Sequence, residues 1–108
     1  MVICVILKQN NKCMNIKVCN NIFSRFKGFM FKKSIDIILC FPKCNSVHTF
    51  FMKCPIDIIM TDKNYKVLLI YKNFQKNKVI LPKKNVYYTF EMPTNTFSLN
   101  VGENLTII

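Results

Sequence analysis

The chain has 108 residues, of which 51% are hydrophobic, and its 16 Lys and Arg against 5 Asp and Glu give a formal net charge of +11. A single domain with an apolar core is therefore expected, over residues 1–108. A disordered, collagen-like or linker chain is excluded, because apolar residues are abundant and only 2 Gly and 4 Pro are present.

Two apolar runs open the chain on either side of the polar turn Gln9–Lys12, and they predict a β-hairpin of residues 1–8 and 15–19. The next segment places Ile, Phe and Met at helical spacing, which predicts the main helix, Ile22 to Met30. The remaining apolar runs have the length and the β-branched or alternating pattern of strands: 35–41, 47–52, 56–61, 66–71, 79–81, 86–92 and 105–108.

Two connections have their own signals. Asp62-Lys63-Asn64 predicts a hairpin turn between two strands, and residues 94–100 are expected to hold one helical turn. About eight short strands with one helix predict a mostly β fold. We expect a small single-domain β-barrel or sandwich with one main short helix.

Lysine supplies every basic residue except Arg25. Proteins that read nucleic-acid sequence favour Arg, because its planar guanidinium makes two hydrogen bonds at once. We therefore expect no specific nucleic-acid partner. An alternative is a weak, salt-sensitive attraction of polyanions by four lysines: Lys32, Lys33, Lys83 and Lys84.

Six cysteines are present, and neither an export signal nor a run of roughly 18 apolar residues is visible. We expect a cytoplasmic protein with free cysteines and no membrane span. Cys40, Cys44 and His48 lie close in sequence, but a structural zinc site needs four ligands and His48 is the only histidine. Gly28 and Gly102 are too few for a phosphate-binding glycine loop. We expect neither a metal nor a cofactor.

One catalytic arrangement is open to this sequence, a Cys/His pair oriented by a carboxylate, and its candidates are Cys44, His48 and Asp57. Asp57 stands in the middle of an apolar run, so its carboxylate needs a charged partner or several hydrogen-bond donors. Arg25 is the partner that we hypothesise, because its guanidinium offers two donors to a carboxylate. Backbone donors or His48 are the alternative.

The segment of residues 46–62, SVHTFFMKCPIDIIMTD, resembles the signature of the domain-of-unknown-function 192 family. Further motifs follow in the family's order, over about residues 15–108: Arg25-Phe26-Lys27-Gly28-Phe29-Met30, Pro42-x-Cys44, Phe90-Glu91-Met92-Pro93 and Val101-Gly102-Glu103. The resemblance implies a compact, mostly β single domain and no established activity. The family's turn after Pro93, a small residue followed by Gly, is replaced here by Thr94-Asn95.

The leading functional hypothesis is a non-enzymatic binding or accessory module for a small ligand or a protein partner. Its candidate binding residues fall in the family-like motifs: Arg25, His48, Thr49, Phe51, Met52 and Asp57. The alternatives are a small enzyme that uses Cys44, His48 and Asp57, and a weak polyanion binder with a lysine-rich surface.

Overall fold

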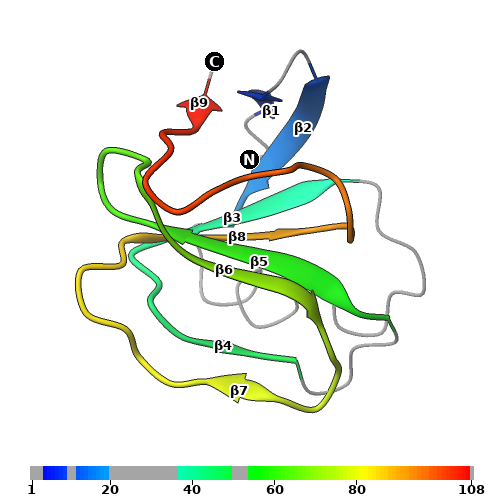
Figure 1. Cartoon of the computed structure of the whole chain (residues 1–108), viewed down its shortest axis with the longest axis vertical. Coiled ribbons are helices and arrows are strands. Elements are labelled where there is room, and N and C mark those ends of the chain that lie inside the picture. Colours follow the sequence, from blue (N-terminus) through cyan, green and yellow to red (C-terminus); the bar gives the residue numbers. More distant parts are fainter. Residues whose placement is uncertain (1–3, 10–11, 20–36, 50–53, 108) are drawn as a thin grey trace.

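The structure is a computed structural model that describes residues 4–9, 12–19, 37–49 and 54–107 (Figure 1). Within these residues nine strands form: β1 (Cys4–Gln9), β2 (Lys12–Val18), β3 (Ile38–Pro42), β4 (Val47–His48), β5 (Ile56–Thr61), β6 (Val67–Phe74), β7 (Val79–Ile80), β8 (Tyr88–Met92) and β9 (Thr106–Ile107). This part of the chain contains no helix, and so none that could span a membrane. The helix predicted over Ile22 to Met30 lies outside the described residues.

Seven strands form one sheet in the order β6-β5-β8-β3-β2-β1-β9. All neighbours are antiparallel except β2 and β3, which are parallel. β4 and β7 pair with each other as a second, two-stranded sheet, which lies apart from the large one in Figure 1. The prediction of a mostly β fold is confirmed. Because the large sheet keeps two edges, its architecture is sandwich-like and not a closed barrel.

The central strands β3, β5 and β8 are buried along most of their length, because each is a nearly continuous apolar run. Residues that face each other on antiparallel strands point to the same side of a sheet. Phe90 of β8 faces Cys40 and Ile59, and this side belongs to one core cluster. Glu91, the next residue, faces Leu39 and Ile58 on the opposite side.

Different parts of the chain cover the two sides of the large sheet. On the Phe90 side the core includes Phe97, Leu99 and Leu105 from the segment after β8. On the Glu91 side it includes Val47 and Ile80 from the two-stranded sheet. The small sheet therefore forms the second layer of the sandwich.

Residues 101–107 connect to both edges of the large sheet. Beside the start of β6, the N–H of Gly102 donates to the carbonyl of Val67 at 2.8 Å, and the N–H of Leu105 donates to the carbonyl of Tyr65 at 2.9 Å. The segment then enters β9, which pairs with β1 at the opposite edge. The two edges that strand pairing leaves open are thus linked by one short stretch of chain.

The prediction of a helical turn in residues 94–100 is wrong. Thr94 and Asn95 form a turn, and Asn95 has a left-handed φ of 62°, which a right-handed helix does not allow. Asn tolerates this conformation better than other residues with a side chain. Glycine adopts this conformation without strain, and Asn95 stands where the resemblance to the family leads us to expect a glycine.

Candidate functional site

The candidate residues from the sequence divide into two groups. Some lie outside the described residues: Arg25, Phe51 and Met52. The others are described, and each can be placed in the fold: Cys44, His48, Thr49 and Asp57.

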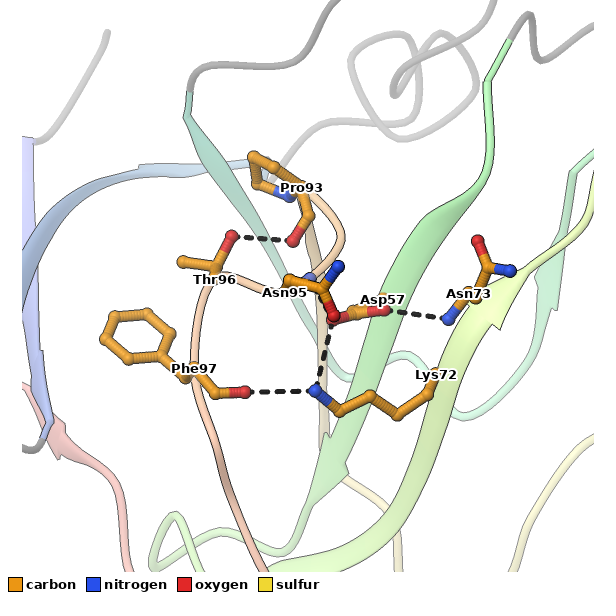
Figure 2. A network of polar contacts seen from close by, with 7 residues as sticks. All are labelled: Asp57, Lys72, Asn73, Pro93, Asn95, Thr96 and Phe97. Atoms are coloured by element: carbon orange, nitrogen blue, oxygen red, sulfur yellow. Dashed lines mark hydrogen bonds and ion pairs between the residues drawn. The ribbon is translucent and has the colours of Figure 1, made fainter.

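Asp57 lies on β5, and its side chain is 3% exposed. Its Oδ1 accepts the N–H of Asn73 at 2.8 Å, and its Oδ2 accepts the N–H of Asn95 at 2.9 Å (Figure 2). The ammonium of Lys72 lies 3.7 Å from Oδ2 and donates to the carbonyl of Phe97 at 3.2 Å. We call Asp57 with these donors the Asp57 anchor.

The Asp57 anchor joins three parts of the chain: β5, the end of β6 and the turn after β8. Both backbone donors belong to residues with positive φ, 51° at Asn73 and 62° at Asn95. The prediction that Asp57 needs a charged partner or several donors is confirmed, and backbone groups supply most of them. Pairing with Arg25 stays a prediction, since Arg25 lies outside the described residues.

Thr49 follows β4 and is 1% exposed. Its hydroxyl donates to the carbonyl of Gln75 at 2.8 Å and accepts the N–H of Lys78 at 2.9 Å. Its own N–H donates to the carbonyl of Lys78, and its carbonyl accepts the N–H of Asn77. Thr49 therefore holds the connection between β6 and β7 in place, and its polar atoms face backbone groups.

Cys44 is half-buried, and its thiol donates to the carbonyl of Ser46 at 3.2 Å. Its carbonyl accepts the hydroxyl of Thr89 at 2.8 Å, which fixes the loop before β4 against β8. His48 is exposed on β4. Among the described residues no three His, Cys, Asp or Glu side chains lie close enough together to hold a metal ion. The structure therefore does not gather Cys44, His48 and Asp57 into such a group.

A cavity of about 200 Å³ opens on the Phe90 side of the large sheet. Cys40 and Pro42 of β3 lie between the flanking strands, and β8 and β2 line the cavity on either side of them. Three groups of side chains line it: the aromatic residues Tyr65, Tyr88 and Phe90, the aliphatic residues Ile16, Val18 and Ile107, and Cys40 with Pro42. We call it the aromatic cavity.

The lining of the aromatic cavity carries no charged side chain. A hydrogen bond with Tyr65, together with burial, raises the pKa of Tyr88 to about 12. Burial likewise raises the pKa of the Cys40 thiol to about 12. Both groups are therefore neutral at pH 7, and the cavity offers an uncharged, mostly apolar surface.

A larger and more open groove of about 530 Å³ lies beside the β5–β6 turn. Lys63 and Lys66 line it, and the ammonium of Lys63 sits 5.4 Å from the ring centre of Tyr87. Asp62 also lines it, and its carboxylate accepts the N–H of Lys66 at 3.0 Å. The groove therefore presents charges of both signs.

The aromatic cavity was not predicted from the sequence. One signal for it was present, since the alternation of residues 86–92 places Tyr88 and Phe90 on one face of a strand. Val18 and Ile107 come from runs near opposite ends of the sequence. Nothing local indicates that side chains from these two runs line the same cavity as Tyr88 and Phe90.

Comparisons with known proteins agree with the resemblance found in the sequence. A family model, DUF192, described as "Uncharacterized ACR", matches residues 5–107. A UPF0127 protein of Thermococcus kodakarensis is 32% identical over 84 residues, which cover 72% of this chain and 53% of the relative. A UPF0127 protein of Thermococcus sibiricus is 30% identical over 84 residues, which cover 72% and 54%. The chain thus spans about half the length of these curated relatives.

Two solved structures share the fold at 14% sequence identity. A protein of unknown function from Novosphingobium aromaticivorans matches with a TM-score of 0.70, over 87% of this chain and 74% of its own. A protein from Sinorhizobium meliloti, described as a "putative transcription regulator", matches with a TM-score of 0.75, over 97% of this chain and 91% of its own. At this identity the likeness establishes the fold alone.

Proposed function

Because this chain belongs to the DUF192 family of uncharacterised proteins, we propose its function from its own geometry: it is a single-domain binding module that holds a small uncharged molecule in the aromatic cavity. In this role the domain is non-enzymatic.

The observation that carries the proposal is the cavity itself. Its volume of about 200 Å³ exceeds the roughly 150 Å³ of an engineered apolar cavity that binds benzene. Ile16, Cys40 and Phe90 are buried, whereas Tyr65 and Tyr88 are half-exposed, so the cavity is reached from solvent. A charged molecule would lose its hydration there without gaining a charged partner.

The described polar residues of the family-like segment favour binding over catalysis. Asp57 and Thr49 use their side-chain oxygens to hold backbone N–H groups of other segments. A carboxylate engaged in this way contributes to stability and to the shape of the domain. This favours the binding module over the alternative in which Asp57 orients His48 for a reaction.

We expect neutral molecules of one or two rings to bind and their charged counterparts to bind at least roughly tenfold more weakly. Titrations with phenol, cyclohexanol, benzoate and benzylammonium, followed by methyl NMR, would measure this. The shifted methyl signals should be those of Ile16, Val18 and Ile107, which line the cavity. If all four compounds leave these methyl signals unchanged, the proposed function is wrong.

A variant that fills the cavity separates specific from surface binding. Val18→Phe should abolish the shifts, because the added ring occupies the space that the ligand needs. Val79→Phe is the matched control, since Val79 is 51% exposed on β7 and does not line the cavity. Equal binding by both variants would place the ligand elsewhere.

We further propose that the protein is cytoplasmic. Three described cysteines are free thiols, which supports a reducing compartment: Cys19, Cys40 and Cys44. The freshly purified, denatured protein should titrate six thiols with a chromogenic thiol reagent, and two or fewer would contradict the proposal. In the native protein Cys19 and Cys40 should react more slowly than Cys44, because both are buried and burial raises the pKa of each thiol.

A further inference from the structure

Three aromatic rings line the cavity as one continuous surface. The rings of Tyr65 and Tyr88 are stacked, with centroids 4.7 Å apart and planes 19° from parallel. Phe90 is tilted against both, with its centroid 6.2 Å from that of Tyr88 and 6.5 Å from that of Tyr65. Each ring therefore has a ring neighbour that holds its orientation, and the surface is preorganised.

The side across from these rings is aliphatic. β3 lies between β8 and β2 in the sheet, so Val18 and Ile16 line the cavity beyond Cys40, away from Phe90. Ile107 of β9 adds a further aliphatic side chain. An occupant thus has rings on one side and branched aliphatic groups on the other.

Few polar groups are available to an occupant of this cavity. The lining side chains contribute two phenol hydroxyls, those of Tyr65 and Tyr88, and the thiol of Cys40. An occupant that carries many hydroxyl groups, such as a sugar, would leave most of them without partners. The occupant is therefore uncharged and carries few polar atoms.

Resting on the proposed function, we infer that the aromatic cavity selects flat aromatic molecules of one or two rings over saturated molecules of the same size. The physical reason is ring geometry. Aromatic pairs gain attraction beyond the area that they bury, because the positive edge of one ring meets the negative face of another. A saturated ring of equal volume buries similar area but lacks this additional attraction. The aromatic molecule should therefore bind roughly three- to tenfold more tightly than the saturated one.

The test compares matched pairs of neutral compounds on the full chain: phenol with cyclohexanol, and toluene with methylcyclohexane. Dissociation constants come from NMR titration of the methyl groups of Val18 and Ile107. The aromatic member of each pair should bind roughly three- to tenfold more tightly. It should also move these methyl signals through its ring current, which the saturated member lacks.

Variants show whether the rings of the cavity are the cause. Tyr88→Leu keeps the lining apolar but removes a ring, so phenol should lose most of its advantage while cyclohexanol still binds. Tyr88→Phe keeps the ring and should keep the preference. Tyr71→Leu is the matched control, because Tyr71 lies on β6, packs edge-on against Phe74 and does not line the cavity.

The outcomes distinguish this inference from the proposed function. Equal affinity for the aromatic and saturated members of each pair overturns the inference but does not contradict the proposed binding function. Absence of binding by all four compounds overturns both. If Tyr88→Leu does not fold, the comparison of matched pairs on the unmodified protein still decides the question.

Discussion

Asp57→Ala should lower the free energy of unfolding by roughly 3–5 kcal/mol, one of the two largest effects that we expect in this protein. The substitution removes the acceptor for two backbone N–H groups, those of Asn73 and Asn95, and leaves the ammonium of Lys72 without its carboxylate. Hydrogen bonds to a charged acceptor contribute roughly 1.5–3 kcal/mol each. Urea unfolding at pH 7, followed by far-UV circular dichroism, measures the change.

Two controls separate burial from hydrogen bonding as such. The carboxylate of Asp62 also accepts two backbone N–H groups, from Asn64 and Lys66, but in an exposed turn. Asp62→Ala should therefore cost only about 1 kcal/mol. Lys72→Met should cost less than about 1 kcal/mol, because the Lys72 side chain is 47% exposed. Equal losses of stability in Asp57→Ala and Asp62→Ala would show that the buried Asp57 anchor stabilises the fold no more than an exposed carboxylate with the same number of hydrogen bonds.

Glu91 gives the second large effect, on the pH dependence of stability. Its side chain faces Leu39 and Ile58 and is 8% exposed, and burial raises its pKa to about 8. In the unfolded chain the pKa returns to its ordinary value of 4.5. Between pH 4.5 and pH 8 the folded protein therefore holds a proton that the unfolded chain has released.

Stability should consequently fall as pH rises from 4.5 to 8, by an amount on the order of 5 kcal/mol from this group. Glu91→Gln removes the titration, so the stability of the variant minus that of the unmodified protein should grow through this pH range and level off above pH 8. Taking the difference cancels the other carboxylates, which are shared. Cys19, whose own pKa is raised by burial with a contribution from Glu91, remains neutral over this range.

Urea unfolding at half-unit pH steps would follow this difference. Glu103→Gln is the control, because Glu103 is half-exposed and its carboxylate accepts hydrogen bonds from Asn100 in a surface turn. A constant difference between Glu91→Gln and the unmodified protein across the range would mean that Glu91 is ionised in the folded state.

Local patterns predicted the elements that depend on local chemistry. The run 56–61 was predicted as a strand and is β5, and the turn Asp62-Lys63-Asn64 leads into β6 as expected. The carboxylate of Asp62 explains the success, since it accepts N–H groups within four residues of itself. Hairpins of this kind can be predicted from the sequence of the turn itself.

The order of strands could not be predicted in this way. β8 lies between β3 and β5, and β2 runs parallel to β3 with a long connection between them. These partners are chosen by side-chain packing across the whole core, and an apolar strand fits many neighbours. The donors of Asp57 illustrate the same limit, because every residue except Pro carries a backbone N–H and nothing marks Asn73 or Asn95 as its partner.

The stretch 101–107 has a consequence for how the protein acquires its shape. Its bonds to Val67 and to β1 join residues that are far apart along the chain, so much conformational entropy is lost before these contacts form. Sheets of such high contact order fold in roughly milliseconds to seconds. Because Ile107 lines the aromatic cavity, the cavity is complete only after this last strand has docked. An occupant thus binds only the fully folded domain. By mass action it should stabilise this state relative to the unfolded and partly folded states.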